Sequence, residues 1–269
     1  MRLPGKPTSD AGAARRSDSG AARRGDHDAA RCGELAAALA EVRDRIVAAC
    51  LGASRAPAEV RLLPVTKTFP ARDVALLADL GVLDAAEARD AEAAAKIADL
   101  TRLRPAVTVR WYMVGRVQRN KSRSVASWAE QVQSVDSVRL VEALDRASRA
   151  ALDSGRRHAP LRVLIQASLD GDPARGGCPL AALDALADRV AAASHLHLDG
   201  VMAVAPLGLE PATAFARLRA VTQRVRRAHP DATELSAGMS GDLEQAIAHG
   251  STCVRVGTAL LGGRPLTSR

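Results

Sequence analysis

The sequence predicts an α/β fold: a single (β/α)8 TIM barrel preceded by one extra helix. Eight short apolar segments alternate with longer amphipathic segments, which is the pattern of parallel strands joined by helical crossovers. The eight units span about 240 residues, the usual length of a closed barrel. Only five residues are aromatic, so the interior must be built from aliphatic side chains, which suits the layered interior of such a barrel.

The strand candidates are apolar runs that end at polar or glycine-containing turns. An open doubly wound sheet is the alternative fold, but its first strand is usually followed by a glycine-rich GxGxxG turn. Here the first strand ends in Thr-Lys-Thr-Phe-Pro at 66–70, without glycine, which favours the barrel. The candidates are Arg61–Thr66, Val82–Ala85 (short and alanine-rich, hence the weakest), Val107–Val114, Gln131–Val135, Leu161–Ser168, Leu196–Val204, Thr233–Ser236 and Thr252–Val256.

The helix candidates carry apolar residues at helical spacing. One of them, Glu34–Cys50, precedes the first strand and is the extra helix. The others lie between the strands: Ala71–Leu80, Glu87–Leu100, Val138–Asp153, Leu180–Ala193, Pro211–His229 and Gly241–His249.

The first 32 residues lack a periodic pattern, and we expect residues 1–32 to form a disordered tail and residues 33–269 to form the barrel. The formal net charge is +8, with a pI near 10.1. Residues 1–33 hold seven Arg or Lys against four Asp or Glu, and the remaining excess is spread over many helices. No basic run is interleaved with aromatic residues, which argues against nucleic acid as the main partner.

Composition also limits the metal content and the cellular location that we expect for the protein. None of the four cysteines forms a CxxC pair and the six histidines form no cluster of metal-ligand spacing, so no metal site is expected. No apolar run is long enough to cross a membrane, and the N-terminus lacks the apolar segment of a secretory signal. A cytoplasmic location is the expectation.

Lys67 follows the first strand, and in a barrel the C-terminal ends of strands carry the active site. A lysine at such a position tends to lose its charge, and the neutral amine attacks aldehydes to give a Schiff base. The alternative is an ordinary exposed lysine just past a strand.

Two later turns have the features of a phosphate site. Ser240 and Gly241 follow the seventh strand, and Gly257 and Thr258 follow the eighth. Barrels often bind phosphate at these two loops, through backbone N–H groups and hydroxyl donors. The alternatives are helix N-caps for Ser240 and Thr258 and a tight turn for Gly257. Arg255, in the eighth strand, either points into the barrel mouth or pairs with a neighbouring acid.

Together these motifs resemble the YggS/PROSC family of pyridoxal 5′-phosphate (PLP) homeostasis proteins, over nearly all of residues 34–265. The resemblance is carried by Val65-Thr-Lys67, by the segment from Trp111 to Lys121 and by Leu235–Asp242 together with Ile247–Thr258. It implies a barrel like the N-terminal domain of alanine racemase and PLP joined to Lys67. It also implies phosphate contacts at Ser240, Gly257 and Thr258, and a place for Arg255 near the pyridine nitrogen.

The sequence departs from the family where a Phe-Gly-Glu-Asn run usually ends the second strand. Alanines stand at positions 85, 86, 88 and 91, whereas Glu87 and Glu92 remain. The alanine-rich run predicts that Glu87 lies in a helix. Gln118, Asn120 and Lys121 are expected to shape the mouth of the barrel.

The resemblance implies a protein that carries or buffers PLP without efficient turnover. We expect it to be a monomer whose partners are PLP-dependent apo-enzymes. A single-domain PLP-dependent racemase or lyase is the alternative, and a phosphosugar barrel enzyme is a third option. Racemisation needs a second acid/base group on the opposite face of the cofactor. Racemases of this fold type take it from a following β-domain, for which we expect no room after the last helix; Tyr112 is the only tyrosine.

Overall fold

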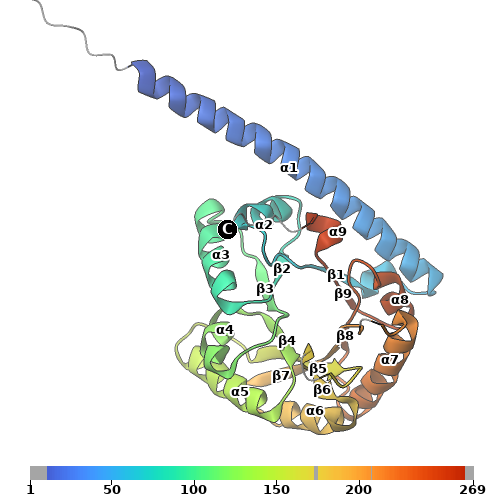
Figure 1. Ribbon diagram of the computed structural model, residues 1–269. Helices are drawn as coiled ribbons and strands as arrows, with labels where there is room; N and C mark the ends of the chain where they lie inside the picture. Colours follow the sequence, from blue (N-terminus) through green and yellow to red (C-terminus); the bar gives the residue numbers. More distant parts are fainter. Residues whose placement is uncertain (1–10, 173–174, 207, 264–269) are drawn as a thin grey trace, which may run out of the picture.

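The barrel expected from the sequence is the architecture of the protein. The computed structural model describes residues 11–172, 175–206 and 208–263, with side chains from Asp26 onward. Eight parallel strands are hydrogen-bonded in the order β1-β9-β8-β7-β5-β4-β3-β2. A bridge between Val65 and Ala86 joins the first strand to the second and closes the ring (Figure 1).

The barrel strands agree closely with the segments expected from the sequence, and two of them agree at both ends. A further short strand, β6 (Cys178–Pro179), pairs with β5 off the main sheet path. The barrel strands are β1 (Arg61–Pro64), β2 (Asp84–Glu87), β3 (Arg110–Met113), β4 (Gln131–Val135), β5 (Leu161–Ser168), β7 (Leu196–Met202), β8 (Glu234–Ser236) and β9 (Cys253–Val256).

The helices surround the strands as a TIM barrel requires (Figure 1). The sequence did not indicate α4, because its run Ser-Arg-Ser-Val-Ala-Ser-Trp is short and carries few apolar residues. The outer helices are α2 (Ala71–Asp79), α3 (Asp90–Leu103), α4 (Ser122–Trp128), α5 (Val138–Asp153), α6 (Leu183–Ala191), α7 (Pro211–Ala228), α8 (Leu243–Ala248) and α9 (Thr258–Leu261).

The extra helix α1 is much longer than the sequence indicated and runs from Ala11 to Gly52 (Figure 1). The expected boundary between residues 32 and 33 therefore falls inside a helix that includes residues 11–32, and residues 1–10 lie outside the described residues. Alanine and arginine, abundant in this stretch, are strong helix formers even without an apolar period. Arg31 fixes the helix to the barrel, donating to Asp73 at 2.8 Å and to the Leu261 carbonyl oxygen at 2.9 Å.

The C-terminal half of α1 packs against the barrel through one apolar stripe. Leu35, Leu39, Val42 and Ile46 are each at most 5% exposed, and they share a core cluster with residues of α8, β9 and α9. The residues recur every three or four positions, which places them on one face of the helix. Burial of this stripe is what attaches the helix, because each buried leucine contributes about 1.5–3 kcal/mol.

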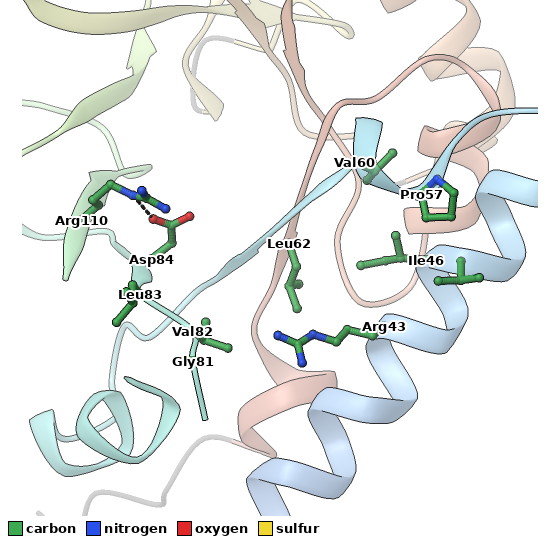
Figure 2. A pocket seen from close by; sticks show the side chains of 11 residues that line it. Arg43, Ile46, Pro57, Val60, Leu62, Gly81, Val82, Leu83, Asp84 and Arg110 are labelled. Atoms are coloured by element: carbon green, nitrogen blue, oxygen red, sulfur yellow. Dashed lines mark hydrogen bonds and ion pairs between the residues drawn. The ribbon is translucent and has the colours of Figure 1, made fainter. Parts of the chain in front are cut away.

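A pocket of about 440 Å³ lies between α1 and the N-terminal ends of β1 and β2 (Figure 2). Its lining is both apolar and charged, with Ile46 from the helix and Leu62 from β1 on one side and the Asp84–Arg110 ion pair on the other. This is the floor of the barrel, opposite the strand ends that carry active sites in this fold. None of the helices that the structure describes is long and apolar enough to cross a membrane.

We predict that Leu39→Ala lowers the free energy of unfolding by about 2–4 kcal/mol, because the change removes a fully packed side chain and leaves a cavity. Leu51→Ala is the matched control in the same helix. Leu51 is 66% exposed, so its truncation should change stability by less than about 0.5 kcal/mol. Urea unfolding of the two variants measures both values. Equal losses would mean that α1 does not pack as described.

Candidate functional site

The segment that follows β1 holds Lys67 in a strained loop. The side chain of Lys67 is half-buried, and among the described residues no hydrogen bond or ion pair engages its amine. The next residue, Thr68, has a φ of 70°. A β-branched residue rarely adopts this conformation, which costs about 1–3 kcal/mol, and strain of this kind is concentrated at functional sites.

A cavity of about 290 Å³ brings together all five residues that the sequence indicated. Its size is close to the lower end of the range for small-ligand pockets, about 300–1,000 Å³. Phe69 and Met239 are among the other lining residues. The five expected residues in the lining are Lys67, Ser240, Arg255, Gly257 and Thr258.

Ser240 and Thr258 come from the two loops that follow β8 and β9. The Ser240 hydroxyl accepts a hydrogen bond from the backbone N–H of Ala259 at 3.2 Å, so it ties the first loop to the first turn of α9. Neither residue caps its own helix with its side chain, because Asp242 and Gly257 occupy the N-cap positions of α8 and α9. Capping of its own helix therefore accounts for neither hydroxyl, although the Ser240 hydroxyl does cap the first turn of the other helix, α9.

Gly238 and Gly257, which lie in these two loops, require glycine on different physical grounds. Gly238 has a φ of 91°, and a Cβ there would lie 2.6 Å from the Cβ of Ala246, so the turn itself requires glycine. Gly257 has an ordinary φ of −109°. It lines the cavity, and a Cβ would come to 3.4 Å from the Val65 carbonyl oxygen, so a tight turn does not explain it.

Arg255 is a buried cation with no carboxylate partner among the described residues. Its side chain donates to the Ser236 hydroxyl at 2.7 Å and to the Ala203 carbonyl oxygen at 2.8 Å, and the residue is 4% exposed. Burial lowers the pKa of the Arg255 guanidinium, because the charged form has lost water. The ion-pair alternative is excluded within the described residues, and the group lies in the wall of the same cavity as Lys67.

A buried ion pair beside Lys67 was missed from the sequence. Glu87 is the last residue of β2, not part of a helix, and it is completely buried. Its Oε1 contacts Lys96 Nζ and accepts a 2.6 Å hydrogen bond from Thr66 Oγ1. Lys96 Nζ also donates to the Thr66 carbonyl oxygen at 2.7 Å. Three side chains thus hold the backbone that leads into Lys67.

Several other expectations fall outside this cavity. Gln118 and Asn120 line a separate pocket of about 760 Å³ beside Asp136 and Arg139. The hydroxyl-bearing ring of Tyr112 lies in the barrel interior, and burial raises the pKa of Tyr112 to about 12. No group of three or more His, Cys, Asp or Glu residues in the described chain has the geometry of a metal site.

The arrangement combines an amine nucleophile with groups that favour an anion. The residues that line the cavity include two basic side chains and three that bear hydroxyls, and no acidic residue of the described chain lines it. An amine can attack an aldehyde carbon, while hydroxyl and backbone N–H groups bind phosphate. A small aldehyde that also bears a phosphate satisfies both requirements at once.

Comparison with known proteins gives a family for the whole barrel. Residues 27–265 match the model of the alanine racemase N-terminal domain. The chain is 52% identical over 244 residues to a pyridoxal phosphate homeostasis protein of Mycobacterium tuberculosis strain H37Rv, covering 87% of this chain and 95% of the relative. It is 38% identical over 240 residues to the Escherichia coli K12 protein of the same name, covering 88% and 99%.

Solved structures show the same relationship. A protein of unknown function from Bifidobacterium adolescentis superimposes with a TM-score of 0.77 at 31% identity, covering 86% of this chain and 96% of that one. PipY of Synechococcus elongatus PCC7942, solved with PLP bound, has a TM-score of 0.72 at 32% identity, covering 85% and 100%.

Alanine racemase of Clostridium difficile 630 shares the fold at 14% identity and a TM-score of 0.65. The match covers 87% of this chain but 58% of the racemase, so the likeness extends to the barrel and not to the whole enzyme. The chain belongs to the family of pyridoxal phosphate homeostasis proteins, built on the barrel of the alanine racemase N-terminal domain.

Proposed function

We propose that this protein binds PLP at the mouth of its barrel and serves PLP homeostasis, with Lys67 as the covalent attachment point and without efficient turnover. The observation that carries the proposal is one cavity that contains an unpaired lysine amine, a buried arginine and two hydroxyl-bearing loops. The name shared by the relatives and the bound PLP of PipY support the same cofactor.

Lys67 supplies the nucleophile. Its nitrogen attacks the aldehyde carbon of PLP and the aldehyde oxygen leaves as water, which gives a Schiff base. The absence of a partner for the amine among the described residues means that no ion pair has to break before attack. The Lys96–Glu87 pair holds the preceding Thr66 in place, so the lysine starts from a fixed backbone.

We assign the phosphate of PLP to Ser240, Gly257 and Thr258. The two hydroxyls line the cavity on the loops after β8 and β9, where barrels of this class commonly hold phosphate. Gly257 brings backbone to the cavity wall without a side chain in between. We assign Arg255 to the pyridine-ring end, where a cationic partner keeps the ring nitrogen unprotonated and weakens PLP as an electron sink.

We infer a carrier in preference to an enzyme from what surrounds the cofactor position. Racemisation and related reactions need a second acid/base group opposite the lysine. Among the described residues that line the cavity there is no Asp, Glu, His, Cys or Tyr. Tyr112 is 3% exposed inside the barrel, and its pKa of about 12 keeps it protonated near neutral pH.

The proposal also covers the partners of the protein and its cellular location. A carrier of PLP delivers it to PLP-dependent apo-enzymes, and we propose that it does so as a monomer. The four cysteines are all free, with Cys50, Cys178 and Cys253 buried, which agrees with a reducing, cytoplasmic setting.

The central test is the site of attachment. Borohydride reduction of the PLP-loaded protein should fix the cofactor on the peptide that contains Lys67, and Lys67→Ala should abolish the adduct. The sequence has four lysines, Lys6, Lys67, Lys96 and Lys121, so peptide mapping by mass spectrometry is unambiguous. Lys121→Ala, which changes an exposed lysine, is the control and should keep the adduct. An adduct on any of the other three lysines would overturn the assignment.

The proposed phosphate contacts lead to a second prediction. Ser240→Ala and Thr258→Ala should each weaken PLP binding by about 1–2 kcal/mol, the contribution of a hydrogen bond to a charged group. The two changes should leave the weaker binding of pyridoxal, which lacks the phosphate, nearly unaltered. Titration by absorbance measures both ligands, and Ser127→Ala in α4 serves as the control. Equal affinity for PLP and pyridoxal in the unmodified protein would exclude a phosphate site here.

Because no second acid/base group lines the cavity among the described residues, we predict negligible catalysis. With saturating PLP, no racemase, transaminase or decarboxylase turnover should approach about 1 s⁻¹, which is within the ordinary enzyme range. Chiral chromatography of alanine and serine, together with keto-acid assays, measures the rates. A turnover above that value on any amino acid would favour the racemase or lyase alternative.

A further inference from the structure

A chain of buried polar side chains runs from Arg255 through the barrel interior to its floor. Arg255 donates to Ser236 Oγ at 2.7 Å, and Ser236 Oγ donates to Gln133 Oε1 at 2.8 Å. Gln133 Nε2 donates to Gln131 Oε1 at 2.8 Å. Ser236 and both glutamines are completely buried, so water does not complete these contacts.

The chain ends on two carboxylates. Gln131 Nε2 donates to Asp199 Oδ2 at 2.5 Å and to Glu234 Oε2 at 2.8 Å. These acids are themselves paired at the barrel floor, Asp199 with Arg162 at 2.8 Å and Glu234 with Arg61 at 2.6 Å. The chain therefore connects the cofactor cavity with the ion pairs at the opposite end of the barrel.

The direction of every hydrogen bond in the chain is fixed by its ends. A guanidinium can only donate and an ionised carboxylate can only accept. Turning either glutamine amide around would place a donor against a donor or an acceptor against an acceptor. Gln133 and Gln131 consequently both point their carbonyl oxygens toward Arg255 and their amide hydrogens toward Asp199 and Glu234.

This orientation compensates the buried charge of Arg255. Loss of water disfavours the cation, and no carboxylate of the described residues contacts it. Two aligned amide dipoles with their negative ends toward the guanidinium replace part of the lost solvation, and consecutive hydrogen bonds polarise one another. The same contacts restrict the guanidinium to one orientation in the cavity wall.

We propose that Gln133, through Ser236, is a positioning residue that sets the orientation of the Arg255 guanidinium toward the pyridine ring of bound PLP and so controls the protonation of that ring. The inference rests on the proposed function and adds to it a residue that does not line the cavity. Gln133 lies in β4, across the barrel from the loops that bind the phosphate.

A purely structural role for Gln133 would make a different prediction. Loss of a buried hydrogen bond lowers the stability of the barrel whatever occupies the cavity. A positioning role also changes the spectrum of bound PLP and the pH at which its visible absorption band titrates. The effect should then require the guanidinium of Arg255.

The test compares Gln133→Leu with Gln166→Leu, the same substitution in β5. Gln166 is half-buried and donates only a 3.4 Å hydrogen bond to the Arg175 carbonyl oxygen. Gln133→Leu should move the pH midpoint of the visible band by about one unit and weaken PLP roughly tenfold, equivalent to the loss of one hydrogen bond to a charged group. Gln166→Leu should leave both values unchanged.

Two further variants keep the inference falsifiable. Ser236→Ala removes a single hydroxyl and should shift the band in the same direction, which provides the test if the larger change prevents folding. In the Arg255→Lys background, Gln133→Leu should add little to the shift, because residues that act through one another are not additive. An unchanged band in a folded, PLP-loaded Gln133 or Ser236 variant would overturn the inference, as would an undiminished shift in the Arg255→Lys background.

Different results would contradict the proposed function and the proposed role of Gln133. If the unmodified protein forms no borohydride-stable adduct on Lys67, the proposed function is wrong. If the adduct forms on Lys67 and the chain variants match the unmodified protein, only the role of Gln133 is wrong.

Discussion

The cavity depends on the seam between β1 and β2, where the barrel closes. Backbone contact there is limited: Val65 bridges to Ala86, and the Thr66 N–H donates to the Ala86 carbonyl oxygen at 2.9 Å. The buried Lys96–Glu87 pair completes the seam by binding Thr66 through both its hydroxyl and its carbonyl oxygen. Removing one member of such a pair typically costs about 3–5 kcal/mol, since the other charge stays buried. Lys67 and the strained Thr68 follow at once, so the seam fixes the start of the cavity.

Charge gives the cavity its preference for an anion. Lys67 and Arg255 line one small cavity, and the two carboxylates that act electrostatically on Arg255 are engaged by other groups, Asp242 by the Met239 N–H and Glu234 by Arg61. Two basic side chains in one cavity favour a ligand that brings negative charge. A phosphate-bearing aldehyde, the ligand that we propose, would supply that charge at one end of the cavity and react with the amine at the other. No Asp, Glu, His, Cys or Tyr of the described residues lines the cavity.

Much of this was available in the sequence, because the strongest signals are local. The bounds of β4, β5 and α5 agree with the expected ones, and β5 and α5 carry clear apolar patterns. The five expected cavity residues come from strand ends and turns, which a barrel brings to one face regardless of the details of packing.

The expectations from the sequence fail where long-range contacts override the local preference for a helix or a strand. Glu87 was expected to begin a helix, but pairing with β3 extends the second strand through Glu87. No local feature of the sequence indicates that the side chain of Lys96 contacts the segment that follows β1. Gln131 and Gln133 did leave a signal: two amides at alternate positions of a barrel strand must share one face, and amides buried inside a barrel need partners.

The exposure of the cavity agrees with delivery as well as storage. Met239 is 38% exposed and Thr258 is exposed at the rim, whereas Arg255 lies at the buried end. In the proposed binding mode the phosphate end therefore faces outward and the ring end inward. The proposed Schiff base would be reversible, because water adding to the imine carbon restores the aldehyde and frees Lys67. On this proposal, a site that is rigid at its base through the interior chain and open at its rim would hold the cofactor in one orientation and let an acceptor protein reach the phosphate before the covalent link is broken.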